Sequence, residues 1–308
     1  MKKIFVSAVL SLCMALLGGC GATETKETSS TSEDKPLVVQ FVPTNNDGSM
    51  EAKTKPFAAY LEEKLGRKVE VTLATDYSTI VEAMASGKVD LGIMPPAAYV
   101  QAKNQGAAKA LLSSKLVDYD QETEMPIEGS STNSFKGEVI VRADSNIQSL
   151  ADLKGKKIAT LSPNSASGYI YPVAEMKDAG INPTTDCTIV TVNDIPSEIT
   201  AVLNGQVDAA FVFEGARYVF QKKFEGTNDL FKDLKVPYLT KGDIPNDAIA
   251  VLPTMDEKLQ QQIKEVFLNM NQDEAAKDAM SLWNHTGYVE ADEKAYDTMS
   301  NYIEKAAQ

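Results

Sequence analysis

The chain has 308 residues and a formal net charge of −13, from 43 acidic residues and 30 lysines and arginines. This excess of negative charge argues against a nucleic acid or an anionic lipid surface as the partner. Three cysteines and one histidine are too few for a disulfide framework or a histidine-rich metal site, so we expect no metal and no cofactor.

Residues 1–19 have the pattern of a signal peptide. Lys2 and Lys3 precede an apolar run over 4–17 that is too short to span a bilayer. Two glycines then lead to Cys20, which resembles a lipobox cysteine that is diacylated after cleavage. Buried acyl chains add about 0.8 kcal/mol of membrane affinity per methylene, so we expect a lipid anchor on the extracytoplasmic face of the cell membrane. The alternative is an ordinary secretory signal that happens to contain a cysteine.

A polar segment, 20–35, follows the signal peptide. After Cys20 it is rich in threonine, serine, glutamate and lysine and has no large apolar residue. It cannot bury a core, and we expect a flexible tether. The remainder, 36–308, is too long for one small core and suits two lobes.

Short apolar runs alternate with helical patterns along 36–308, which is typical of α/β lobes with largely parallel sheets. The expected strands are 37–42, 69–73, 89–93, 138–142, 157–161, 187–192 and 207–213. The expected helices are 49–65, 77–86, 96–104, 165–179, 196–204 and 214–223. The tail over 255–305 is expected to be helical.

One segment of the chain is repeated. Residues 81–93 align without a gap with residues 199–211, at an offset of 118 residues. Each copy predicts a helix ended by a glycine (Gly87 or Gly205), a tight turn to Val-Asp and a buried strand. The repeat indicates two lobes of similar build, and the alternative is chance likeness between two generic units.

We expect the chain to cross between the two lobes near 133–137 and near 235–240. Lobe 1 then comprises 36–134 plus 238–308, and lobe 2 comprises 135–237. Lobes joined in this way are typical of hinged proteins that close on a ligand between the carboxyl ends of their strands.

Several motifs resemble one family, the phosphonate, phosphite and phosphate-binding proteins of ABC importers. They are ATDY at 74–77, GKVD at 87–90, the serine-rich SPNSASGY at 162–169 and VLNGQVDA at 202–209. The resemblance implies an α/β, two-lobed type II periplasmic-binding-protein fold with a hinge and an interlobe ligand cleft. It also implies a monomer without enzymatic activity that delivers a small-molecule ligand to an ABC permease.

The family resemblance implies an anion site in the serine-rich loop. Ser165, Ser167 and Gly168 fall where relatives hold the phosphonate group with hydroxyls and backbone N–H groups. Free N–H groups and the positive end of the helix dipole favour an anion there without any lysine or arginine. The alternative is that Ser165 is only a helix N-cap.

Other candidate ligand contacts also follow from the resemblance. Tyr77 falls on a ligand-contacting tyrosine, and Phe135 falls where relatives can have a tyrosine. Glu214, directly after an expected strand, and Asp247, before an apolar run, fall where relatives that take aminophosphonates receive the amino group. The alternatives are a half-buried aromatic for Tyr77, and a cap or a solvated acid for each carboxylate.

The chain departs from the family pattern at two places. The loop over 192–197 has Asp194, which is a further candidate ligand contact, and no histidine, and Ala166 stands where a threonine is common. Both changes weaken the case for a phosphonate dianion and leave room for a more cationic ligand. Two further alternatives are a sensor with the same cleft and a cofactor-free enzyme on a two-lobed fold.

The lipobox interpretation predicts the behaviour of a Cys20→Ala variant. Without the acylated thiol the protein should move from the membrane to the soluble fraction, because no acyl chain holds it there. Detergent partition of cell fractions measures this, and a protein consisting of 36–308 should keep its ligand affinity. A variant that stays in the detergent phase would exclude the lipid anchor.

Overall fold

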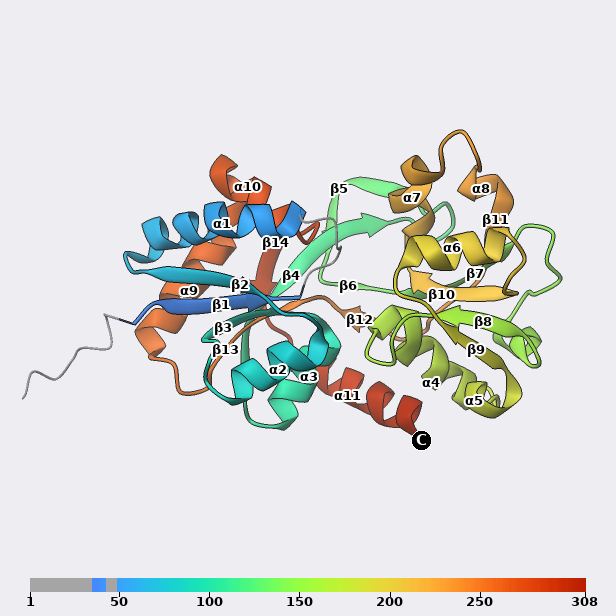
Figure 1. Cartoon of the computed structure of the whole chain (residues 1–308), viewed down its shortest axis with the longest axis horizontal. Helices are drawn as coiled ribbons and strands as arrows, with labels where there is room; N and C mark the ends of the chain where they lie inside the picture. The colour runs from blue at the N-terminus through green and yellow to red at the C-terminus, as the bar shows by residue number, and fades with distance from the viewer. Residues whose placement is uncertain (1–34, 43–48) are drawn as a thin grey trace, which may run out of the picture. The chain divides into compact units, whose positions relative to one another are not determined.

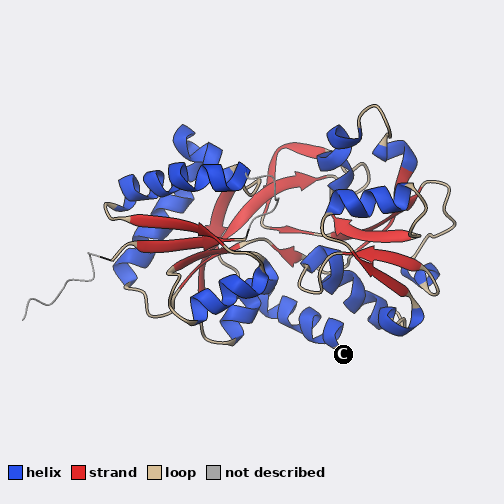
Figure 2. Ribbon diagram, in the orientation of Figure 1, coloured by secondary structure: helices blue, strands red, loops and turns tan. Residues whose placement is uncertain are grey.

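Two β-sheets with helices on both faces form the described part of the chain (Figures 1 and 2). The computed structural model describes residues 35–42 and 49–308. The expected signal peptide, Cys20 and nearly all of the expected tether lie outside these residues. Within them, no helix is both long enough and apolar enough to cross a bilayer.

The first sheet contains seven strands among the described residues, on the left in Figure 1. Its strands, in sheet order, are β14 (Gly287–Glu290), β4 (Lys109–Tyr119), β13 (Ala248–Val251), β3 (Leu91–Met94), β1 (Leu37–Phe41) and β2 (Val69–Leu73), with β5 (Pro126–Thr132) paired to β4. Strands β1, β2 and β3 are parallel, and β13 runs antiparallel to β3. One face packs on α1 (Ser49–Leu65), α9 (Glu257–Asn269) and α10 (Glu274–Met280), and the other on α2 (Tyr77–Ala85) and α3 (Pro96–Asn104).

The second sheet contains five strands among the described residues. In sheet order they are β11 (Leu234–Leu239), β7 (Gly137–Arg142), β10 (Ala209–Phe213), β8 (Lys157–Thr160) and β9 (Thr188–Thr191). Strands β10, β8 and β9 are parallel, and β7 runs antiparallel to β10. One face packs on the π-helical turn η2 (Ala166–Ile170) and α4 (Tyr171–Asp178), and the other on α6 (Ile195–Leu203) and α7 (Ala216–Gln221). Two short helices, α5 (Pro183–Asp186) and α8 (Leu230–Asp233), complete this part.

A two-stranded antiparallel pair, β6 (Ser134–Phe135) with β12 (Ile244–Pro245), links the two sheets and forms the hinge. One residue after β6 the chain enters the second sheet as β7, and two residues after β12 it enters the first sheet as β13. Because β7 and β13 run antiparallel to β10 and β3, both enter at the carboxyl ends of parallel strands. The carboxyl ends of both sheets therefore lie next to the same hinge. The exact lobe boundaries stay a prediction, although β11 continues to Leu239, beyond the expected end of lobe 2.

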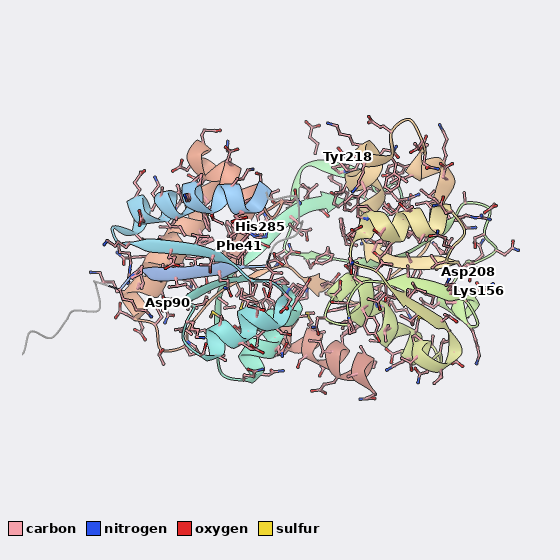
Figure 3. The ribbon with its side chains drawn as sticks, in the orientation of Figure 1. Phe41, Asp90, Lys156, Asp208, Tyr218 and His285 are labelled. Atoms are coloured by element: carbon pink, nitrogen blue, oxygen red, sulfur yellow. The ribbon has the colours of Figure 1, made fainter. Side chains whose placement is uncertain are left out.

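The repeated segments adopt the same structure, which confirms the expected helix, turn and strand in each copy. The two helix-ending glycines have φ values of +65° and +67°, a conformation that glycine adopts without steric cost. The Asp90 carboxylate accepts a hydrogen bond from the N–H of Val38 at 2.9 Å, and the Asp208 carboxylate accepts one from the N–H of Lys157 at 2.8 Å. Figure 3 shows Asp90 and Asp208 at the ends of the two sheets far from the hinge.

The correspondence extends to the start of the two helices, with one informative difference. Asp76 and Asp194, again 118 residues apart, are the N-caps of α2 and α6. Four residues after each cap stand Ile80 and Glu198, and both are fully buried. The second copy thus places a carboxyl group where the first has an apolar side chain.

A carboxy-terminal helix, α11 (Glu293–Ala307), contacts α3 beside the first sheet and α4 beside the second (Figure 1). The buried carboxylate of Glu175, on α4, accepts hydrogen bonds from the hydroxyls of Tyr302 at 3.1 Å and Tyr238 at 2.6 Å. It also accepts from the backbone N–H groups of Lys241 at 3.0 Å and Gly242 at 2.9 Å, on the second passage between the sheets. One carboxylate thus joins α4, α11 and a passage next to the hinge.

The expectation of a wholly helical tail is wrong at β14, which pairs antiparallel with β4. The strand has only four residues, too few to show a period of two between helical segments. Its Tyr288 is buried against the ring of Phe267, at a centroid distance of 5.1 Å, and this tertiary contact fixes the strand.

Replacing Glu175 by glutamine should destabilise the protein. A glutamine side chain has one acceptor oxygen for four donors, and hydrogen bonds to a charged group contribute about 1.5–3 kcal/mol each. We expect Glu175→Gln to lower the free energy of unfolding by about 2–4 kcal/mol in urea denaturation. Glu304→Gln, at an exposed position on α11, is the matched control and should change it by less than about 0.5 kcal/mol. Equal effects of the two substitutions would contradict the role of Glu175.

Candidate functional site

Each sheet has a topological switch point at the edge next to the hinge, where the connections from two neighbouring strands go to opposite faces of the sheet. In the first sheet the chain leaves β1 toward α1 on one face and leaves the neighbouring β3 toward α3 on the other. In the second sheet it leaves β8 toward η2 and leaves the neighbouring β10 toward α7 on the opposite face. Ligands of open α/β sheets bind at such points, so these two facing edges form the candidate site.

Tyr77 and Asp247 come together at the edge of the first sheet. Burial, and then the negative charge of Asp247, raise the pKa of the Tyr77 hydroxyl to about 12. An Asp247 oxygen also lies 3.3 Å from Nε2 of His285, and Nδ1 of that ring lies 3.2 Å from the hydroxyl of Tyr288. Figure 3 shows His285 on the side of the first sheet toward the hinge. The aspartate therefore keeps an oriented carboxylate, one-quarter exposed, at the candidate site.

His285 is a neighbour of the site that the sequence alone did not reveal. Its side chain is almost fully buried and stacks on Trp283 at a centroid distance of 5.6 Å. Because Asp247 precedes it by 38 residues, no local pattern indicates the contact.

The serine-rich loop is tightly packed at the carboxyl end of β8. The Ser165 hydroxyl accepts a hydrogen bond from the N–H of Gly168 at 3.2 Å, so Ser165 does act as a cap. Ser165 and Ser167 are each 7% exposed. A Cβ at Gly168 would lie 2.9 Å from the side chain of Leu161, so only glycine fits there without a shift. The role of these residues as anion ligands stays a prediction.

Glu214 is bound to the first passage between the sheets. One carboxylate oxygen accepts a hydrogen bond from the backbone N–H of Lys136 at 3.0 Å, directly after hinge residue Phe135. Burial raises the pKa of Glu214, whereas that hydrogen bond and the Lys136 charge oppose the rise. Phe135 itself is half-buried on the apolar cluster that includes Ile244. Both residues thus lie at the hinge, and their contact with a ligand stays a prediction.

Asp194 has a different environment from the other candidates. It is exposed, and its carboxylate accepts a hydrogen bond from the N–H of Ser197 at 2.7 Å as the N-cap of α6. It also borders a groove of about 900 Å³ along α6 and β9, whose lining includes Lys157 and Lys223. The lining residues of this groove all belong to the part of the chain around the second sheet. A ligand contact of Asp194 stays a prediction.

Two fully buried glutamates near the edge of the second sheet that lies next to the hinge were not identified from the sequence. Burial and the nearby carboxylate of Glu124 raise the pKa of Glu138 well above its ordinary value, although Arg217 opposes this rise. Burial, and then the charge of Asp194, raise the pKa of Glu198 to about 10. For Glu198 a signal was available, because it falls on the apolar stripe of α6.

A buried ion pair joins the two parts of the chain beside this edge. Glu124, at the turn of the β4–β5 hairpin, accepts two hydrogen bonds from Arg217 of α7, at 2.8 Å and 2.9 Å. Gly215, with a φ of +83°, lies under the ring of Tyr119, where a Cβ would come within 2.7 Å. Figure 3 shows Tyr218 at this contact. The β4–β5 hairpin of the first sheet thus packs on α7 of the second lobe.

Within the described residues, no group of three or more histidine, cysteine, aspartate or glutamate side chains is placed to hold a metal ion. A family described as "ABC transporter, phosphonate, periplasmic substrate-binding protein" matches residues 39–296, which is most of the chain. The chain belongs to this family. The expected membership of the phosphonate-binding protein family is therefore confirmed.

One relative and two solved structures show what the chain is similar to. The phosphate-import protein PhnD of Mycolicibacterium smegmatis is 31% identical over 217 residues, which cover 67% of this chain and 64% of that protein. The match thus spans slightly less than two thirds of that relative's length. XAC2383 from Xanthomonas citri, bound to chloride ion, has a TM-score of 0.72 at 21% identity, covering 88% of this chain and 99% of that chain.

A second solved structure is PhnD1 from Prochlorococcus marinus (MIT 9301) in complex with methylphosphonate. It has a TM-score of 0.66 at 19% identity, covering 89% of this chain and 99% of that chain. At these identities the solved structures show the fold alone. The expected α/β, two-lobed periplasmic-binding-protein fold of this family member is confirmed.

The buried Glu198 predicts that stability decreases as pH rises. The folded state keeps the carboxyl proton up to about pH 10, whereas an unfolded glutamate loses it near 4.5. Unfolding therefore releases this proton at intermediate pH, and the free energy of unfolding falls by about 1.4 kcal/mol per pH unit from this group. Urea denaturation between pH 5.5 and 8 measures how the free energy of unfolding changes with pH. In Glu198→Gln this decrease should be smaller than in the parent protein by about 1.4 kcal/mol per pH unit. Identical slopes in the two proteins would contradict a buried, neutral Glu198.

Proposed function

We propose that the chain is the solute-binding component of an ABC importer, and that it captures a small phosphonate-like solute between its two lobes. The observation that carries this proposal is the pair of switch points beside one hinge, with hydroxyl and N–H donors at the edge of the second sheet and carboxylates at both edges. The protein acts by binding and release, not by catalysis. Its partners are the solute and the permease of the importer.

The second lobe supplies the anion half of the site. Together, η2 and α4 form a continuous helix that begins at Ala166, and the first N–H groups of a helix have no partner within it. The Ser165 hydroxyl accepts a hydrogen bond from the N–H of Gly168, and Ser167 stands in the first turn. Backbone donors and the helix dipole hold an anion without a basic side chain. The name of the mycolicibacterial relative and the methylphosphonate in the Prochlorococcus structure support an anion of the phosphate or phosphonate class.

The carboxylates supply the opposite half. Asp247, beside Tyr77, and Glu214, beside the hinge, receive an ammonium group of the solute. A zwitterion such as an aminoalkylphosphonate satisfies both halves. Closure of the lobes about the β6–β12 hinge then removes the solute from water and strengthens both sets of contacts.

A more cationic solute is the second candidate. The observation in its favour is the number of carboxyl groups near the second edge, where Glu138, Glu198 and Glu214 are all more than nine-tenths buried. The loop before α6 contributes Asp194 and no histidine. A screen of phosphonates, phosphate and organic cations by thermal shift separates the two candidates, since a ligand raises stability by RT ln(1 + [L]/Kd).

The location of the protein follows from its N-terminal segment and its family. The relatives are named as periplasmic and import proteins, which act outside the cytoplasmic membrane. A diacylated Cys20 holds this protein as a monomer on the extracytoplasmic face of the membrane.

The zwitterion model predicts a preference for amino-bearing ligands. An aminoalkylphosphonate should bind ten- to a hundredfold more tightly than the matched alkylphosphonate, since one charge-assisted hydrogen bond contributes about 1.5–3 kcal/mol. Glu214→Gln and Asp247→Asn should each reduce this preference, whereas Ser167→Ala should weaken both ligands alike. Isothermal titration calorimetry of the four proteins with one ligand pair tests this. Equal affinity of the parent protein for the pair would exclude an ammonium site at the carboxylates.

A further inference from the structure

Glu198 is a buried side chain that no structural role explains. Glu198 is fully buried, and neither of its carboxyl oxygens has a hydrogen-bond partner. It lies on the stripe of α6 formed with Ile195, Ile199 and Val202, which packs on the second sheet. A buried carboxyl without hydrogen bonds is unfavourable, so its presence needs an explanation.

The internal repeat shows that the fold itself does not require this carboxyl group. Ile80 occupies the corresponding position of α2, and it is also fully buried. Both helices begin at an aspartate cap, end before a left-handed glycine and pack on the same kind of strand. An isoleucine satisfies this position in the first lobe. The glutamate in the second lobe is therefore a local specialisation.

The position of α6 directs Glu198 toward the candidate site. A loop of three residues joins β9 to this helix. The N–H of Val192 in that loop donates a hydrogen bond to the carbonyl of Thr160, at the carboxyl end of β8, at 2.9 Å. Helical side chains lean toward the N-terminus of their helix. Glu198, in the first turns of α6, thus leans toward the edge where the serine-rich loop begins. The hydroxyl of Thr160, also fully buried, likewise has no partner.

We propose that Glu198 is a further ligand contact, whose carboxyl group donates a hydrogen bond to the anionic group of the solute from the α6 side of the second sheet. This rests on the proposed function. The raised pKa of the side chain keeps it protonated at neutral pH, and a protonated carboxyl has an O–H donor where a carboxylate has none.

The burial of Glu198 is compatible with this role. The other expected contacts on this lobe are nearly as inaccessible, with Ser165 and Ser167 at 7% and Glu214 at 8% exposure. A site that closes over its solute buries its donors in the same way.

Two substitutions separate a ligand contact from a tolerated misfit. Glu198→Ile installs the residue of the first lobe, and Glu198→Gln keeps a neutral hydrogen-bond donor. We expect Glu198→Ile to raise the melting temperature and to weaken binding of both methylphosphonate and 2-aminoethylphosphonate by ten- to a hundredfold. Glu198→Gln should stay within about threefold of the parent protein. Thr200→Ala, on the exposed face of the same helix, is the control and should bind as the parent does.

The outcomes distinguish this inference from the proposed function. If the parent protein binds either phosphonate and Glu198→Ile binds it equally well, the glutamate is not a ligand contact, and the proposed function stands. If the parent protein binds neither phosphonate, the proposed function fails and the anion contact fails with it. Should Glu198→Ile not fold, Glu198→Ala removes the same donor and gives the same comparison.

Discussion

The structure depends on one constraint, the edge at which the chain enters each sheet from the hinge. Strands β7 and β13 follow the β6–β12 pair after one and two residues, and both run antiparallel to the strand beside them. This brings the carboxyl ends of two sets of parallel strands to one place. The helix starts, with their free N–H groups, and the residues that follow each strand are thereby gathered around the hinge.

The two lobes share a backbone unit but differ in the chemistry that it carries. In each, an aspartate at the far end of the sheet binds the N–H of the neighbouring strand, as Asp90 and Asp208 do. Near the hinge the side chains diverge, as the pair Ile80 and Glu198 shows. Parts that hold the fold together are therefore repeated, whereas parts next to the candidate site are specific to one lobe. This is the distribution expected of a binding protein whose lobes meet different ends of one solute.

The elements of regular period could be predicted from the sequence, and the contacts between distant segments could not. The repeated helix, glycine and strand are visible because a helix-ending glycine and a buried apolar run are local signals. The antiparallel strands β4, β5, β11, β13 and β14 were not among the expected strands. For β14, pairing with β4 rather than its own pattern defines the strand. The same holds for Asp247 with His285 and for Glu175 with Tyr302, whose partners are far apart in the chain. Glu198 could have been identified from the sequence, because it is a charged residue on an apolar helical stripe.

The place of β13 has a consequence for the order in which the protein folds. It lies between β3 and β4 in the first sheet, yet it comes after the whole of the second sheet in the chain. As synthesis proceeds from the N-terminus, β3 and β4 emerge without the strand that joins them, and unpaired edges of this kind invite wrong partners. The second sheet, formed by one uninterrupted stretch from β7 to β11, can assemble first. The half of the molecule that starts the chain is thus the half completed last.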